Sequence, residues 1–300
     1  MSLTVAALIT NFNTWDFSQR CIQALNDLSL PYLTKILVVD DASTQTMPIT
    51  LPDNVKVIKN LSNQGYVASV NIGFSYLSED IVLLLDSDAY PKEEIIQTVV
   101  KRFTENSTLG ALGFRLVDHN NNPSGSYEKE PKALGLLLGQ KLELKTSNLF
   151  SSSTTEPLCI FSCAIAIRRI AFESIAGFDE EFDFLDADND FSIRLRKAKW
   201  DIQVDHDLVA FHEGGGSEQT TAKRVLRFHK NRWLLLRKHN LIHNSLVLKL
   251  SLAIRHLLEY SILKLLGNFL IKDSASLKDK IYSRQQLLRQ VWSAYGNEPK

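Results

Sequence analysis

The sequence predicts an α/β protein with a mostly parallel sheet flanked by helices, followed by a helical appendage. Short runs rich in Val, Ile and Leu alternate with helical patterns over residues 1–120. Polar residues gather where several of these runs end. From residue 222 onward the pattern is helical and strongly basic. A hydrophobic content of 44% in a chain of 300 residues is enough to bury a core, which indicates one large domain with an appendage.

The first part of the chain alternates between strands and helices. Predicted strands, each a short apolar run, cover 3–10, 35–41, 55–60 and 80–88. Predicted helices lie between and after them, at 15–30, 64–78 and 91–106. Strands that alternate with helices in this way favour a parallel sheet covered on both faces.

The same alternation returns after an interruption at residues 118–157. Two loop-like stretches there, "DHNNNPSGS" and "TSNLFSSSTTEP", indicate a surface excursion or a flexible acceptor-side loop. The elements predicted next are a strand at 158–169, a short helix at 170–176 that stops at Gly177, a helix at 188–198 and a strand at 201–213. Arg168 and Arg169 are expected to anchor the short helix, with phosphate binding as the alternative.

The net charge is zero but unevenly distributed. Residues 1–221 hold 18 basic and 30 acidic side chains, whereas residues 222–300 hold 16 basic and 4 acidic ones. A basic tail on an acidic body favours contact with an anionic surface. Residues 246–272 of the tail are very apolar, but charged residues interrupt them at Lys249, Arg255, Glu259 and Lys264. A membrane-spanning helix is therefore not predicted.

Two interpretations of the tail, residues 222–300, stay open. It forms a basic amphipathic helix that lies on a membrane surface, or a helical pair that packs on the principal domain or on a second subunit, giving a homo-oligomer. No nucleic-acid partner is expected. The three cysteines fit no zinc or disulfide spacing, and the N-terminus lacks the basic region of a signal peptide. Both observations favour a cytoplasmic protein, peripheral to the membrane if the tail binds it.

Polar residues follow four of the predicted strands, at 10–13, 40–43, 60–63 and 86–88. Ligands of such sheets bind at the carboxyl ends of the strands. Asp86 and Asp88, one residue apart after a buried strand, can hold a divalent cation and through it a diphosphate. The alternative is that they cap the next helix. Asp40 and Asp41 can accept hydrogen bonds from a base, and a phosphate can lie beside Asn63, Gly65, Asn71 and Gly73.

At this point the sequence resembles a known family. The segments that carry the resemblance are "ALITNFN", "ILVVDDAST", "NQGYVASVNIGF", "DIVLLLDSDAY", "IRRIAFESIAGFDEEF", "DNDFSIRLRKAKW" and "VAFHEGGGS". In this order they are similar to the motifs of family-2 inverting glycosyltransferases with the A-type glycosyltransferase fold, which is Rossmann-like. The bacterial rhamnosyltransferase-like branch is the most similar. The resemblance covers roughly residues 3–240.

The resemblance implies a catalytic domain at 1–221, with a donor half at 1–117 and an acceptor half at 158–221. It implies transfer from a UDP- or dTDP-sugar, with Mn²⁺ or Mg²⁺, to a glycan or lipid-linked glycan in polysaccharide biosynthesis. The residues that it places around the nucleotide sugar are Thr10, Phe12, Asp40 and Asp41 at the base, Asn63, Gly65 and Asn71 beside ribose and diphosphate, and Asp86 toward the ribose. Asp88 and His212 match the metal ligands. Val70 stands where many relatives carry Arg.

An acidic cluster, Asp179–Asp190, holds seven carboxylates in twelve residues. Direct displacement at the anomeric carbon requires one carboxylate to accept the proton of the acceptor hydroxyl. Relatives carry "E-D-x-D" here, and the resemblance makes Asp188 the base, although Ala187 replaces the Glu. Asp186 and Asp190 remain alternatives. Crowded carboxylates raise one another's proton affinity, but Asp190 can instead pair with Arg194.

Two other functions compete with sugar transfer. A nucleotidyltransferase shares the nucleotide-binding half, but it would need a basic Gly-rich loop after the first strand, and "TNFNTWD" is not one. A non-catalytic nucleotide-sugar sensor or assembly protein is supported by Ala187 and Val70, the two departures from the family pattern.

Overall fold

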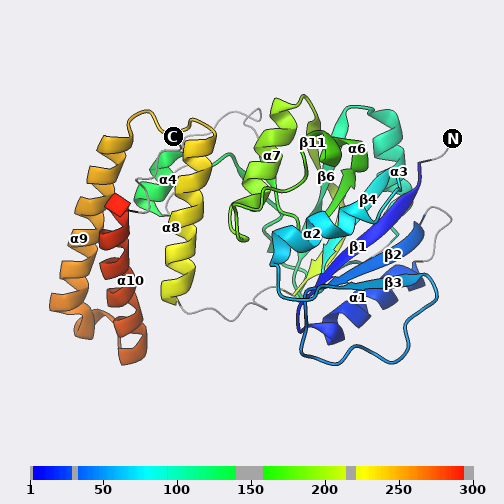
Figure 1. Ribbon diagram of the computed structural model, residues 1–300. Helices are drawn as coiled ribbons and strands as arrows, with labels where there is room; N and C mark the ends of the chain where they lie inside the picture. The colour runs from blue at the N-terminus through cyan, green and yellow to red at the C-terminus, as the bar shows by residue number, and fades with distance from the viewer. Residues whose placement is uncertain (1–2, 29–32, 93, 140–157, 214–220, 294–300) are drawn as a thin grey trace. The chain divides into compact units, whose positions relative to one another are not determined.

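The computed structural model describes residues 3–28, 33–92, 94–139, 158–213 and 221–293. The chain divides into two compact units (Figure 1). Unit 1 comprises Met1–Glu130 and Pro157–Gly216, and unit 2 comprises Pro131–Glu156 and Ser217–Lys300. The second half of the predicted acceptor-side loop and the glycine run at 214–216 lie outside the described residues.

Unit 1 is built on a nine-stranded sheet with the order β3-β2-β1-β4-β10-β6-β11-β5 and with β7 beside β6 (Figure 1). The strands are β1 (Val5–Asn11), β2 (Leu33–Asp40), β3 (Val55–Lys59), β4 (Ile81–Asp86), β5 (Ala89–Pro91), β6 (Leu109–Val117), β7 (Pro123–Ser124), β10 (Ala164–Arg168) and β11 (Asp201–His212). The parallel pairs are β1–β2, β1–β4, β2–β3 and β6–β11, and β10 is antiparallel to β4 and β6. A second, small antiparallel sheet pairs β8 (Tyr127–Lys129) with β9 (Leu158–Ile160).

Helices cover both faces of this sheet. The helices of unit 1 are α1 (Trp15–Asp27), α2 (Tyr66–Ser75), α3 (Ile96–Glu105), α6 (Arg169–Ser174) and α7 (Ala187–Lys197). Because side chains alternate along a strand, Val5, Ala7 and Ile9 of β1 join a core with α1 and α3. Leu8 faces α2, so closely that a Cβ on Gly73 would lie 2.4 Å from its Cδ1. Each buried Leu or Ile stabilises the fold by about 1.5–3 kcal/mol.

The expected strand at 158–169 is divided in the structure. β9 and β10 are separate strands, and Phe161–Cys163 turns between them. Arg168, at the end of β10, is buried, and its guanidinium donates to the carbonyl oxygens of Phe103, Asn106 and Leu109 at 2.8–3.0 Å. Arg168 therefore ties β10 to the end of α3 and the start of β6, and not to the short helix that the sequence analysis expected it to anchor.

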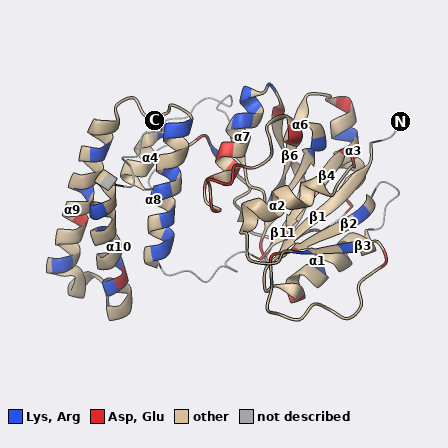
Figure 2. Ribbon diagram, viewed as in Figure 1, with Lys and Arg blue, Asp and Glu red and all other residues tan. Residues whose placement is uncertain are grey.

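Unit 2 is helical, with α4 (Ala133–Leu138), α8 (Thr221–Lys238), α9 (Ser245–Leu270) and α10 (Ser274–Ser293). Its core contains Leu136, Trp233, Leu252 and Val291, one from each helix. Figure 2 shows basic residues along α8, α9 and α10, and acidic residues concentrated in the loop that leads into α7 of unit 1. Among the residues that the structure describes, no helix has the length and apolar character needed to cross a membrane.

Candidate active site

The polar ends of three parallel strands meet at one edge of the sheet in unit 1. Asn11 at the end of β1 is in register with Asp40 at the end of β2, and Thr10 is in register with Asp86 at the end of β4. Since β10 runs antiparallel to β4, its first residues lie at this same edge, and the Asp86 N–H donates to the Cys163 carbonyl at 2.9 Å. The sheet thus brings residues about 80 positions apart in sequence to one place.

Asp86, Asp88 and His212 form a potential metal site at this edge. Each offers one ligand atom, and these atoms all lie within 4.8 Å of one another. His212 reaches the group because β11 pairs with β5, with His212 in register with Ala89. Its Nε2 lies 3.7 Å from Asp88 Oδ1. Two carboxylates and one imidazole are a donor set for a divalent cation.

The carboxyl group of Asp86 supports this assignment. Its Oδ1 is buried and has no hydrogen-bond partner among the described residues. Burial, followed by the charges of Asp88 and Asp188, raises the pKa of Asp86 to about 8. A carboxylate buried beside other carboxylates is costly unless a positive group accompanies it, and a cation bound by Asp86 and its neighbours would provide that charge.

Asp188 lies beside this cluster, in the first turn of α7. Burial has the largest effect on the pKa of Asp188 and raises it, while the nearby Ser162 hydroxyl and backbone N–H lower it. Together with the charges of Asp186 and Glu128, burial raises the pKa of Asp188 to about 6. A carboxylate with this pKa is largely ionised at neutral pH and still a useful proton acceptor.

Tyr66 and Ser162 are hydrogen-bonded to each other close to Asp86 and Asp188. The Tyr66 hydroxyl, at the start of α2, lies 2.7 Å from Ser162 Oγ, and its proximity lowers the pKa of Asp86. Burial, and then the charges of Asp86 and Asp188, raise the pKa of Tyr66 well above its usual value, so the phenol stays protonated. The Tyr66 ring also meets the half-exposed Phe184 edge-to-face at 5.5 Å, which holds part of the acidic loop against α2.

The other two carboxylates considered as the base have partners within the protein. Asp190 is 0% exposed, and its Oδ2 accepts a hydrogen bond from Arg194 Nε at 2.6 Å. Asp186 is buried at the N-terminal end of α7 with a left-handed backbone (φ 64°), and its Oδ1 accepts from Asn189 Nδ2 at 2.7 Å. These contacts favour structural roles for both.

Asp40 and Asp41, the residues expected at the base, organise the adjoining loops. The Asp40 carboxylate accepts hydrogen bonds from Asn11, at 2.7 Å, and from Ser43. The Asp41 carboxylate accepts from the side chain of Asn60 and from the backbone N–H groups of Gln64 and Gly65, at 2.8–2.9 Å. Both carboxylates are buried.

The remaining predicted donor-site residues differ in exposure. Phe12, just after β1, is 48% exposed, and Thr10 is half-buried within β1. Asn63 is exposed, while Gly65 has a φ of +87° and precedes α2.

Asn71 makes contacts that the sequence did not indicate. Its Nδ2 donates to the Phe178 carbonyl at 2.9 Å and to Glu180 at 3.0 Å, and its Oδ1 accepts from the Phe178 N–H at 2.9 Å. Asn71 therefore fastens the start of the acidic cluster to α2.

Ser162 and Tyr66 are the site residues that sequence reasoning missed. Ser162 falls in a segment that looked like the interior of one strand, and Tyr66 is an ordinary aromatic residue at the start of a helix. The only sequence signal was indirect, since Phe161-Ser162 interrupts the run of β-branched and small residues at 158–169.

Comparison with known proteins adds independent information. A family model described as glycosyl transferase family 2 matches residues 6–175, more than half of the chain. The N-acetylglucosaminyl-diphospho-decaprenol L-rhamnosyltransferase of Mycobacterium tuberculosis is 23% identical over 67% of this chain and 74% of its own length. The pre-mycofactocin glycosyltransferase of the same species is 27% identical over 49% of this chain. An inactive polypeptide N-acetylgalactosaminyltransferase-like protein 5 of Macaca fascicularis is 23% identical over 64%.

The chain spans only 48% of the length of the macaque relative and 30% of the length of the pre-mycofactocin enzyme. Two solved structures resemble the fold. GalNAc-T7 with UDP, GalNAc and Mn²⁺ has a TM-score of 0.56 at 15% identity, over 78% of this chain and 48% of that one. The mannosyltransferase PcManGT from Pyrobaculum calidifontis, in complex with GDP-Man and Mn²⁺, has a TM-score of 0.55 at 14% identity, over 98% and 74%. These likenesses confirm the fold that the sequence predicted.

Proposed function

The chain belongs to glycosyl transferase family 2, and on that premise we propose that it is an inverting, metal-dependent glycosyltransferase of polysaccharide biosynthesis. The donor is a nucleoside-diphosphate sugar, a UDP- or dTDP-sugar, and the acceptor is a hydroxyl of a glycan or lipid-linked glycan. The supporting observation is the position of Asp188, with a pKa of about 6, beside the Asp86–Asp88–His212 cluster. A mycobacterial relative named for a decaprenol-linked acceptor supports the acceptor class.

In this proposal Asp188 is the general base. Its carboxylate accepts the proton of the acceptor hydroxyl while that oxygen forms a bond to the anomeric carbon, and the bond from that carbon to the diphosphate breaks on the opposite side. Asp86, Asp88 and His212 would hold a divalent cation, Mn²⁺ or Mg²⁺, which when bound offsets the negative charge of the leaving diphosphate. Ser162, which is hydrogen-bonded to Tyr66, lowers the pKa of Asp188 and so favours the ionised base.

Paired variants separate donor binding from transfer. Candidate nucleotide sugars are screened by thermal shift with Mn²⁺ or Mg²⁺, because a true donor stabilises the folded protein by mass action. Asp188→Asn is expected to keep the donor-induced shift and to lose turnover, whereas Asp88→Asn loses the metal-dependent shift as well. Asp207→Asn, an exposed carboxylate on the same strand as His212, is the matched control and leaves both unchanged. Wild-type turnover by the Asp88 and Asp188 variants would refute the mechanism.

The competing function is a non-catalytic nucleotide-sugar-binding protein. Similarity to a relative named as inactive, together with Ala187 in place of the family's Glu, favours it. Calorimetry that shows donor binding by the wild-type chain, with no turnover over a broad acceptor panel, would support this function instead. A product whose anomeric proton shows the inverted configuration by NMR would support the inverting transferase.

A further inference from the structure

The outward face of α9 in unit 2 is apolar over its whole length. Large hydrophobic side chains are exposed on it from the first turn to the last, including Leu265 at 82% and Phe269 at 94%. The others are Leu246, Val247, Leu250, Ile254, Leu257, Leu258, Ile262, Leu266 and Leu270. We call this set the α9 face. Contiguous apolar surface of this kind marks a site of interaction.

The charged groups near the middle of α9 are used inside unit 2. Arg255 Nε donates to Glu259 at 2.8 Å, and its Nη1 donates to the carbonyl oxygens of Leu136 and Leu137 in α4. Glu259 also accepts from Arg284 of α10 at 2.5 Å. His256 is 0% exposed. α9 is therefore apolar on much of its circumference: Leu248 and Leu252 pack in the core of unit 2, the Arg255–Glu259 pair is held by α4 and α10, and large apolar side chains remain exposed.

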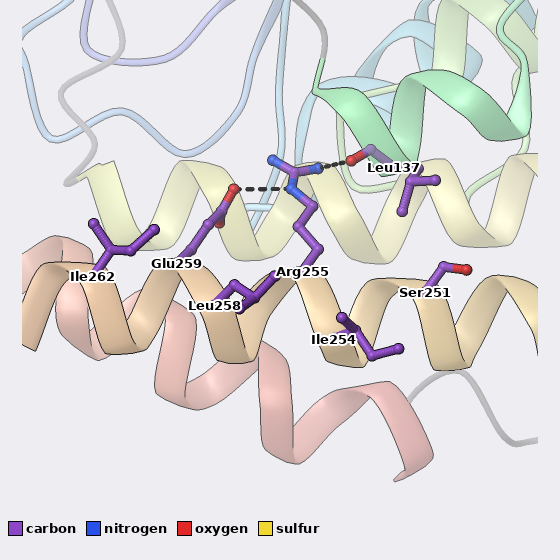
Figure 3. Close-up of a pocket in the computed structure, with 7 residues that line it drawn as sticks. All are labelled: Leu137, Ser251, Ile254, Arg255, Leu258, Glu259 and Ile262. Atoms are coloured by element: carbon purple, nitrogen blue, oxygen red, sulfur yellow. Dashed lines mark hydrogen bonds and ion pairs between the residues drawn. The ribbon is translucent and has the colours of Figure 1, made fainter.

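A groove of about 490 Å³ adjoins the α9 face (Figure 3). Ile254, Leu258 and Ile262 of α9 line it together with Leu137 of α4. Ser251 and the Arg255–Glu259 pair, whose hydrogen bond Figure 3 shows, supply its polar part. Because the same side chains line the groove and belong to the α9 face, the two form one continuous apolar surface.

The charge around the α9 face is positive. Lys264 is exposed, and Lys249 is half-buried with its Nζ 5.6 Å from the centre of the Trp233 ring. Glu259 is the only acidic residue of α9, and two arginines bind it. The wider region 222–300 holds 16 basic and 4 acidic residues. An apolar face bordered by cations is complementary to a bilayer surface that contains anionic lipids.

We propose that the α9 face docks unit 2 on the surface of an anionic lipid bilayer, with α9 lying in the plane of the interface. Its apolar side chains enter the boundary between headgroups and acyl chains, while Lys249 and Lys264 remain at the level of the headgroups. A second copy of the chain is the less suitable occupant. Pairing two α9 faces would bring lysines together with no free carboxylate of α9 to neutralise them.

Vesicle sedimentation of the full-length chain tests this docking without any assay of sugar transfer. The probe is a set of vesicles made from equal parts phosphatidylglycerol and phosphatidylcholine, compared with phosphatidylcholine alone. Wild type is expected to partition onto the anionic vesicles, and less so as salt rises from about 0.1 M to about 1 M, since screening then acts over about 3 Å. The double variant Leu265→Asp with Phe269→Asp should bind about tenfold more weakly or worse, because two large side chains no longer leave water.

Ile49→Asp is the matched control, because Ile49 is 99% exposed but lies in unit 1. It should bind vesicles like the wild type. Circular dichroism of every variant checks that the helices are intact, as expected for substitutions at exposed positions. Lys264→Glu should weaken binding to the anionic vesicles and leave binding to neutral ones unchanged.

Two results would overturn the docking proposal. One is equal binding of anionic vesicles by the wild type and the Leu265/Phe269 double variant. The other is a wild-type chain that does not bind vesicles but forms dimers in analytical ultracentrifugation, while the double variant stays monomeric. That result would make the α9 face an interface between copies. Neither result bears on donor binding or turnover, so this proposal and the proposed function fail independently.

Discussion

Replacing Asp188 by Asn should stabilise unit 1 at neutral pH while abolishing sugar transfer. The pKa of Asp188 is raised from 3.8 to about 6. At about 1.36 kcal/mol per pKa unit, the ionised carboxylate costs the folded state up to about 3 kcal/mol. The amide of the variant has nearly the same size and carries no charge, so it avoids this cost.

The pH dependence of this effect has a definite sign. Between pH 3.8 and about 6 the folded wild type binds a proton at Asp188 that the unfolded chain has released. The free energy of unfolding contributed by this group is therefore fully present below pH 3.8 and is lost as the pH rises through about 6. The Asp188→Asn variant lacks this dependence. Its advantage over the wild type should be under about 1 kcal/mol near pH 4 and about 3 kcal/mol at pH 8.

Hydrogen exchange measured by mass spectrometry gives the required free energy. Peptides from β4 and β10 report the opening of unit 1, and a chelator keeps the Asp86–Asp88–His212 cluster free of metal. Asp190→Asn is the matched control, since it makes the same chemical change two residues away. It should destabilise unit 1 by about 3 kcal/mol, because Arg194 loses a buried partner. An Asp188→Asn variant that is no more stable than wild type at pH 8, or equally stabilised at pH 4 and pH 8, would refute the reasoning.

Three further predictions concern activity and packing. The kcat/KM of the wild type should rise about tenfold per pH unit up to a plateau above about pH 6, where Asp188 is ionised. Asp186→Asn should move this inflection to lower pH, because the charge of Asp186 raises the pKa of Asp188. An inflection at the same pH in this variant would exclude the coupling. Gly177→Ala should destabilise unit 1 by about 2 kcal/mol or more in urea denaturation, because Gly177 has a φ of +71° and a Cβ there would lie 2.7 Å from Asn71 Oδ1. A loss of stability below about 0.5 kcal/mol would mean that the loop shifts freely. Arg168→Met should lower the free energy of unfolding by about 3 kcal/mol, because it removes three hydrogen bonds to backbone carbonyls. Calorimetry should show unchanged affinity for the donor, and a large loss of that affinity would indicate that Arg168 binds phosphate.

Much of the fold follows from local patterns. The strands around Ala6, Val38 and Leu84 are continuous apolar runs because the sheet is covered on both faces. β6 was not predicted, since Gly110 and Gly113 weaken its strand pattern. The structure explains the first glycine, because a Cβ on Gly110 would lie 2.7 Å from Trp200 Cβ. Trp200 thus fills space beside the sheet. Nothing in the sequence around Gly110 or around Trp200 indicates that these two residues are in contact.

Some residues of the candidate site could be predicted from local motifs, but others could not, because their roles depend on contacts between distant segments. Asp86, Asp88 and His212 follow strands in recognisable motifs, and the structure brings their ligand atoms together. Ser162 could not be predicted, because its role depends on β10 running antiparallel to β4. Nor does the sequence show that Asn71 binds the loop at Phe178, more than a hundred residues away. The roles of individual donor-site residues stay predictions.

The sequence by itself determined the strand–helix order, the polar strand ends and the uneven charge, because each depends on side chains that are neighbours along the chain. Only the tertiary structure decided which carboxylates share a low-dielectric space. The pKa values of Asp86 and Asp188 are raised by burial and by groups distant in sequence. It also decided the orientation of α9. The helical pattern shows an apolar helix interrupted by charges, but only packing decides that Arg255 and Glu259 are held by α4 and α10 while side chains such as Leu265 and Phe269 remain exposed.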